Sequence, residues 1–101
     1  MKIKLLIAFL IKKNIMSEKR MAYIRIAIEA EKIGDRIVEN KSEVKSKDSF
    51  IEKMKSTINT YSCNNREIIR DCDKLPELDT SDPFRFIDLF YDIVEKYLFP
   101  I

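Results

Sequence analysis

Apolar residues recur at steps of three and four from Ser49 to Leu75, the spacing that lines one side of a helix. The series, which includes one asparagine, is Ile51, Met54, Ile58, Tyr61, Asn65, Ile68, Cys72 and Leu75. Ser49 followed three residues later by Glu52 is typical of a capping box, and Pro76 is expected to end the helix. The pattern therefore predicts one continuous helix from Ser49 to Leu75, whose apolar stripe needs a partner.

A second stripe with the same spacing predicts a helix from Ser17 to Glu39. Its members are Tyr23, Ile26, Ala30, Ile33 and Ile37. Ala27 and Gly34 stand seven residues apart on one side of this helix, where small side chains permit a neighbouring helix to approach closely. We expect Gly34 to serve this close packing rather than to form a hinge.

The polar stretch 40–48 is expected to join the two helices as an antiparallel hairpin. A register that pairs Ile37 with Ile51 also places Tyr23 opposite Asn65. A polar residue in an apolar seam fixes register at a cost in stability. We therefore predict that Tyr23 and Asn65 set the register, with the Tyr23 hydroxyl as a hydrogen-bond partner of Asn65.

A third helix is predicted after Asp82 and Pro83, which supply an N-cap and a first-turn proline. Apolar residues cover nearly every side of it, whereas a surface helix of a monomer shows one stripe. Either this helix is wedged between the other elements, or part of its aromatic surface contacts another protein. The candidate interface residues are Phe84, Phe86, Phe90, Tyr91, Tyr97 and Phe99.

The predicted fold is all-α, an antiparallel helical hairpin with the third helix packed across it as a small three-helix bundle. A chain of 101 residues is long enough for one domain, and its single glycine offers little material for tight hairpin turns. We assign residues 16–101 to this domain and residues 1–15 to an N-terminal extension.

The extension contains an apolar run, Leu5–Ile11, with lysines on both sides. A membrane-spanning helix needs about 20 apolar residues, so this run is too short to span. Three interpretations stay open: a helix packed on the domain, a membrane-surface or targeting segment formed by residues 1–13, or translated sequence upstream of a start at Met16.

The distribution of charge and the residue types present disfavour or exclude some classes of function. The net charge is +2, but four lysines lie in the first fifteen residues, and the remaining 15 basic and 17 acidic residues give −2. This balance does not favour a nucleic-acid partner, which would require a basic face. The chain has no histidine, so histidine-dependent nucleophiles and histidine metal ligands are excluded.

Cys63 and Cys72 would lie roughly 13 Å apart along one continuous helix and half a turn round from each other. They could not form a disulfide in that geometry. We therefore expect two reduced thiols of an intracellular protein, with Cys72 in the apolar stripe and Cys63 outside it.

The string Ile33–Val38, together with Tyr61, Arg66, Ile69 and Cys72, resembles the first part of the caffeine-induced death protein family. That family includes a small cysteine-containing protein of the mitochondrial intermembrane space. The resemblance implies a helical mitochondrial protein, and Cys72 matches the later of the family's cysteines.

The similarity covers about half of the chain, residues 25–72. The earlier cysteine of the family would fall near Ile51, so the cysteine pair is missing here. The loop between the helices is shorter than in the family, and residues 76–101 do not follow its C-terminal part.

We expect a non-enzymatic helical interaction module, a small subunit or adaptor of an intracellular assembly, with no cofactor or metal. The partner would be another protein or a second copy of the chain. The alternative is an organelle-targeted or membrane-surface protein, of the mitochondrial intermembrane-space type, addressed by its N-terminal segment. We expect a cytoplasmic location, with the mitochondrion as the alternative.

Overall fold

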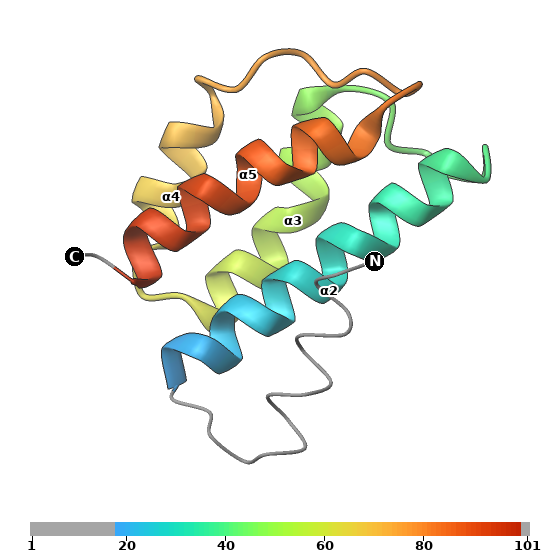
Figure 1. The fold of residues 1–101 in the computed structure, drawn as a ribbon. Coiled ribbons are helices and arrows are strands. Elements are labelled where there is room, and N and C mark those ends of the chain that lie inside the picture. The colour runs from blue at the N-terminus through green and yellow to red at the C-terminus, as the bar shows by residue number, and fades with distance from the viewer. Residues whose placement is uncertain (1–17, 100–101) are drawn as a thin grey trace.

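The computed structural model describes residues 18–99, which form four α-helices (Figure 1). The helices are α2 (Glu18–Val38), α3 (Lys47–Tyr61), α4 (Asn65–Cys72) and α5 (Pro83–Leu98). Successive helices reverse direction, and each of α2 and α4 packs against both α3 and α5. The all-α class is confirmed, but this part of the chain contains four helices where we predicted three.

Helix α2 buries two stripes because it packs against α3 and α5 together. The predicted stripe is buried at Ile26, Ala30, Ile33 and Ile37. A second buried series, at the same spacing, consists of Ile24, Ala27, Glu31 and Gly34. The buried face of α2 is therefore two adjacent stripes wide, one for each neighbouring helix.

Gly34 of α2 lies in close contact with α5. A Cβ atom at this position would lie 2.6 Å from Cε1 of Phe84 and 2.7 Å from Cδ1 of Ile87. Both distances are shorter than normal carbon contacts. The predicted use of Gly34 in close helix packing is therefore confirmed.

The connection between α2 and α3 begins at Asn40, whose φ of 58° ends α2 in the left-handed conformation. Ser46 is the N-cap of α3, and its hydroxyl accepts a hydrogen bond from the Ser49 backbone N–H. The Ser49 side chain accepts one from the Ser46 N–H in return. Our placement of Ser49 as the cap was wrong by three residues, because Ser49 is the far member of the capping box.

The predicted continuous helix is interrupted at residues 62–64. Ser62 is extended, with ψ of 131°, and its hydroxyl accepts a hydrogen bond from the Asn64 N–H at 3.1 Å. Serine and asparagine side chains compete in this way with helical hydrogen bonds. The chain therefore turns here, and α4 starts a new helix that reverses beside α3.

Helix α5 lies between α2 and α4, with Pro83 in its first turn. Phe50 of α3 is fully buried and meets the rings of Phe86 and Phe90 edge-on, with centroids 5.0 and 5.2 Å apart. Contacts of this kind add about 0.5–1.5 kcal/mol beyond the burial of the rings. The core of the described residues is thus centred on these three phenylalanines.

Lys47, the first residue of α3, holds the connection between α4 and α5. Its ammonium group donates to the carbonyl oxygens of Asp73 and Leu75, at 2.9 and 3.1 Å. Its backbone N–H donates to Glu77 Oε1, and hydrogen bonds from Lys47 and Leu78 lower the pKa of Glu77. The end of α4 is therefore tied to the start of α3.

The N-terminal extension, with its apolar run Leu5–Ile11, and the alternative start at Met16 lie outside the described residues. The three interpretations of that segment stay open.

A double-mutant cycle tests the contact at Gly34. Replacing Gly34 by alanine should gain up to about 1 kcal/mol of helix propensity and lose about 1–3 kcal/mol through overpacking against Phe84 and Ile87. We expect Gly34→Ala to destabilise the protein, and to become neutral or stabilising in a Phe84→Ala background. Chemical denaturation of the four proteins measures the coupling, and equal effects in both backgrounds would contradict the close contact.

Candidate functional site

Half of the predicted interface residues belong to the core. Phe86, Phe90 and Tyr91 are 3%, 0% and 8% exposed, so the prediction that they face a partner is wrong. Of the two interpretations of the last helix, these three residues fit the one in which it is wedged between other elements. The break after α3 supplies a separate α4, and α5 is enclosed by α2 on one side and α4 on the other.

The other three predicted interface residues lie at different depths. Phe84 is partly buried over Gly34, and Tyr97 is partly buried with its hydroxyl on Asp71. Phe99 is 38% exposed and keeps a ring contact with Tyr23, with centroids 5.8 Å apart. Of the six, Phe99 alone presents more than a third of its surface.

The predicted register pair does not form. The Tyr23 hydroxyl donates to Glu95 of α5 at 2.9 Å, and burial together with the Glu95 carboxylate raises the pKa of Tyr23. Asn65 Oδ1 accepts the backbone N–H of Arg66, and the described α2 and α4 do not touch. The prediction failed because α4 is a separate helix that packs on the far side of α3 from α2.

Three of the five exposed large apolar side chains of the described residues belong to one end of the bundle. We call Met21, Tyr61 and Phe99 the terminal patch; they are 38%, 44% and 38% exposed. They come from the first turns of α2, the last residue of α3 and the residue after α5, which lie at the same end (Figure 1). We had assigned Tyr61 to the buried stripe, but the helix ends at this residue and its side chain faces solvent.

Charge is distributed unevenly between the two ends of the bundle. We define the terminal end as residues 18–28, 54–68 and 90–99, and the loop end as residues 29–53 and 69–89. The terminal end has six basic and four acidic residues, and the loop end has nine basic and thirteen acidic ones. The described chain is thus positive where the terminal patch lies and negative at the opposite end.

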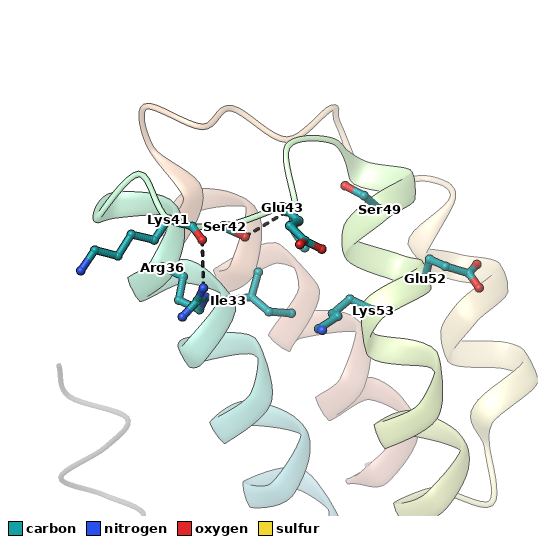
Figure 2. A pocket seen from close by; sticks show the side chains of 9 residues that line it. Ile33, Arg36, Lys41, Ser42, Glu43, Ser49, Glu52 and Lys53 are labelled. Atoms are coloured by element: carbon teal, nitrogen blue, oxygen red, sulfur yellow. Dashed lines mark hydrogen bonds between the residues drawn. The ribbon is translucent and has the colours of Figure 1, made fainter.

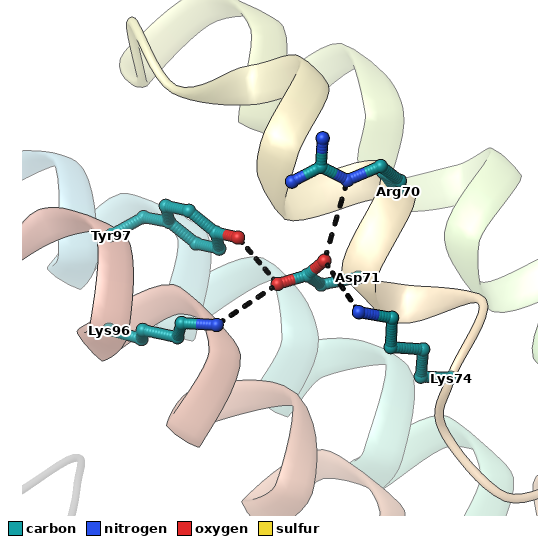
Figure 3. Close-up of polar contacts among 5 residues, drawn as sticks. All are labelled: Arg70, Asp71, Lys74, Lys96 and Tyr97. Atoms are coloured by element: carbon teal, nitrogen blue, oxygen red, sulfur yellow. Dashed lines mark hydrogen bonds and ion pairs between the residues drawn. The ribbon is translucent and has the colours of Figure 1, made fainter.

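Asp71 of α4 is a buried carboxylate that fastens α4 to α5 (Figure 3). Its Oδ2 accepts the Tyr97 hydroxyl at 2.5 Å and lies 3.5 Å from Lys96 Nζ. Its Oδ1 lies 3.5 Å from Lys74 Nζ and 3.6 Å from Arg70 Nε. The Tyr97 hydrogen bond and the two ammonium groups lower the pKa of Asp71 to about 2, so this carboxylate is charged at neutral pH.

A second buried carboxylate, Glu31, connects α2 to α5. The Tyr91 hydroxyl donates to Glu31 Oε2 at 2.9 Å and also lies 3.4 Å from the Ala27 carbonyl oxygen. Burial and the Glu31 charge raise the pKa of Tyr91, which keeps its hydroxyl protonated as a donor. Sequence reasoning missed Glu31 and Asp71, although each falls among buried positions of its helix at steps of three or four.

A hollow of about 620 Å³ lies between the end of α2, the connection 39–46 and α3 (Figure 2). Its polar groups are largely used within the turn. Arg36 Nη2 donates to the Lys41 carbonyl at 3.0 Å, and the Ser42 hydroxyl accepts the Val44 N–H at 2.9 Å. The Ser49 hydroxyl belongs to the capping box of α3. We therefore interpret this hollow as part of the turn rather than as a ligand site.

The two cysteines are placed as predicted. Cys63 is exposed in the turn between α3 and α4, Cys72 is fully buried in α4, and neither forms a disulfide in the described structure. Burial raises the pKa of the Cys72 thiol to about 12, with the nearby Asp73 and Asp71 charges adding to the effect. Cys63 is therefore the accessible thiol of this pair.

The described residues contain no cluster of three or more cysteine or acidic side chains arranged to hold a metal ion. None of the four described helices is long and apolar enough to cross a membrane.

Comparison of the chain with protein-family models, with curated protein sequences and with solved structures finds no match. The resemblance to the caffeine-induced death protein family therefore stays a prediction from the sequence.

The buried Asp71 should make stability depend on pH in the acid range. Its pKa is about 2 in the folded chain and about 3.9 in an unfolded one. The stabilisation it contributes is therefore complete above pH about 4 and is lost as the pH falls towards about 2. We expect Asp71→Asn to be less stable than wild type at neutral pH and to lose less stability across this range. Denaturation curves at several pH values measure both effects. The control is Asp92→Asn, which changes an exposed carboxyl group of α5. The same dependence of stability on pH in wild type and Asp71→Asn would contradict the prediction.

Loss of the Tyr91 hydroxyl should destabilise the contact between α2 and α5. Hydrogen bonds to charged groups contribute about 1.5–3 kcal/mol, and we expect Tyr91→Phe to lower the free energy of unfolding by this amount. Tyr61→Phe removes an exposed hydroxyl and should change stability little. Urea denaturation compares the two variants, and equal stabilities would show that the Glu31 contact contributes little.

Proposed function

We propose that this chain is a non-enzymatic helical interaction module, a small subunit or adaptor of a larger assembly. The observation that carries the proposal is the terminal patch, where three large apolar side chains remain more than a third exposed at one end. Exposed apolar groups of this kind supply association energy of about 25 cal/mol for each Å² they bury. The terminal patch is the contact surface in this proposal.

The polar groups inside the fold support the same proposal. Asp71 and Glu31 lie at helix–helix contacts, where each accepts a tyrosine hydroxyl from α5. A carboxylate used in this way fixes the arrangement of helices. We therefore infer that Asp71 and Glu31 stabilise the fold and that the terminal patch contacts the partner.

The second candidate function is that of an organelle-targeted or membrane-surface protein of the mitochondrial intermembrane-space type. It is favoured by the N-terminal sequence, in which Lys2, Lys4, Lys12 and Lys13 flank the apolar run Leu5–Ile11. An apolar segment with basic flanks is typical of surface-bound or targeting segments. This candidate and the adaptor are compatible, since an adaptor can work at a membrane surface.

The size of the protein in native extract tests the adaptor proposal. Full-length tagged chain is expressed in its source cells, and the extract is separated by size with and without mild detergent. We expect wild type to migrate in a species larger than the monomer, and Tyr61→Ser/Phe99→Ser to migrate as the monomer. The change should leave the fold intact, because both side chains are exposed.

The loop end offers a matched control. Val38 and Leu89 are 63% and 38% exposed, so Val38→Ser/Leu89→Ser removes a similar apolar surface away from the patch. This control should behave like wild type. Migration of the wild type as a monomer, or equal effects of the two double changes, would reject the terminal patch as a contact surface.

A further inference from the structure

We propose that α4 is a thiol–disulfide switch, in which a reversible bond between Cys63 and Cys72 holds this helix unwound. The two residues are the only cysteines of the chain. They stand on either side of one helix, with Cys63 in the turn before α4 and Cys72 as its last residue. The inference goes beyond the proposed function, because it concerns the state of α4 and not the terminal patch.

The folded α4 keeps the two sulfur atoms apart. Its first and last residues, Asn65 and Cys72, are separated by about 10 Å along the helix axis, and Cys63 precedes Asn65 by two residues. A disulfide needs Cα atoms no more than about 7 Å apart. The Cys63 thiol is exposed and lies 3.1 Å from Asn64 Oδ1, whereas Cys72 is fully buried. The disulfide and the folded helix therefore exclude each other.

Helix α4 depends on its neighbours for stability. It has eight residues, of which Ile68, Asp71 and Cys72 are buried. An isolated helix shorter than about 12 residues is marginally stable in water. The Asn64 side chain, at the N-cap position, makes no capping hydrogen bond in the described structure. Short elements of this kind open locally while the rest of a fold stays intact.

Two polar contacts hold α4 closed. The Tyr97 hydroxyl of α5 donates to Asp71 Oδ2 at 2.5 Å. The Lys47 ammonium group of α3 donates to the carbonyl oxygens of residues 73 and 75, directly after the helix. Both contacts act at the end of α4 where Cys72 lies. When they break, Cys72 is released, while α2 keeps its own contacts with α3 and α5.

The bond forms by two exchange steps, with glutathione disulfide as the oxidant. The exposed Cys63 thiolate attacks one sulfur of this disulfide, forms a mixed disulfide and releases one glutathione thiolate. When α4 opens, the Cys72 thiolate attacks the Cys63 sulfur and releases the second glutathione. Two protein thiols and one glutathione disulfide thus become one protein disulfide and two glutathione thiols, which receive the two electrons and the two protons.

Burial makes the second step depend on opening. It raises the pKa of the Cys72 thiol to about 12 in the closed chain, and the thiolate is the attacking species. The second step therefore proceeds in proportion to the fraction of chains in which α4 is open. A flexible loop of about ten residues closes in roughly 10–100 ns, so the two sulfur atoms of an open chain meet readily.

The switch changes the surface of the protein. In the reduced chain α4 covers one flank of α5, and Ile68 is fully buried. In the disulfide form Ile68 and this flank of α5 become accessible to solvent and to other molecules. A disulfide that competes with a folded helix is easily reduced, and reduction lets α4 refold and cover the flank again.

The test starts from the purified, reduced full chain in buffers of reduced and oxidised glutathione. Free thiols are blocked with a maleimide at set times, and the masses of the intact chains are measured. We expect a glutathione adduct that converts into a monomer lacking two hydrogen atoms, and this monomer should revert on addition of reductant. Cys63→Ser, a change at an exposed position, should not form this monomer. A covalent dimer, or an adduct that does not convert, would overturn the proposal.

Two tyrosine variants distinguish local opening from global unfolding. Tyr97→Phe removes the donor to Asp71 and should speed conversion of the adduct about ten- to a hundredfold, the factor that corresponds to one hydrogen bond to a charged group. Tyr91→Phe removes the donor to Glu31 between α2 and α5 and leaves the contacts of α4 in place, so its conversion rate should match wild type. Equal acceleration by both changes would show that the bond forms from the unfolded chain and would overturn the switch.

Hydrogen exchange of the oxidised chain shows which helix has opened. We expect the backbone N–H groups of residues 65–72 to lose protection in the disulfide form, while those of α2 and α3 keep it. Unchanged protection in α4, or loss of protection in all four helices, would overturn the proposal.

Discussion

The contact of Phe50 with Phe86 and Phe90 is the interaction on which the arrangement of helices depends. The backbones of α3 and α5 do not meet, because these helices lie across the bundle from each other. The Phe50 ring fills the space between them, edge-on to both partners and without solvent exposure. Since Phe50 is fully buried, a smaller side chain at position 50 would leave a cavity between α3 and α5, the kind of change that costs about 3–5 kcal/mol.

Two buried carboxylates then restrict how α5 can sit in that arrangement. Tyr91 donates to Glu31 on the α2 side, and Tyr97 donates to Asp71 on the α4 side. Apolar contacts alone hold the position of α5 less exactly, because apolar side chains of similar size can repack with modest loss. A displaced α5 would separate both carboxylates from their donors, and an unsatisfied buried charge is costly. We therefore interpret the two pairs as setting the register that we had assigned to Tyr23 and Asn65.

The parts of the fold that follow from the apolar periodicity could be predicted from the sequence. The prediction failed where short polar side chains end a helix. The spacing of residues along the sequence predicts four features: the stripe of α2, the close contact at Gly34, the separate placement of Cys63 and Cys72, and the proline at the start of α5. The break at Ser62–Asn64 does not, because Ile58 and Ile68 continue the apolar period across it. Local hydrogen bonds by Ser62 override that period. Because this turn was missed, Asn65 was assigned to the contact between the wrong two helices. The separate helix α4, which packs against α5, was missed as well, and this explains why Phe86, Phe90 and Tyr91 were taken for interface residues.

The same break determines which surface remains available for function. Because α3 stops at Tyr61, its last side chain joins Met21 and Phe99 at one end instead of entering the core. The short α4 returns towards the loop end, and the connection 73–82 adds acidic residues there, where Lys47 ties it to α3. The acidic excess therefore lies at the loop end, and three of the five exposed large apolar side chains of the described residues lie at the terminal end. Charges that lie more than about one Debye length, about 8 Å at physiological salt, from a charged surface are largely screened from it. The two ends can therefore respond to different partners, and the terminal end is the one whose charge and apolar groups act together.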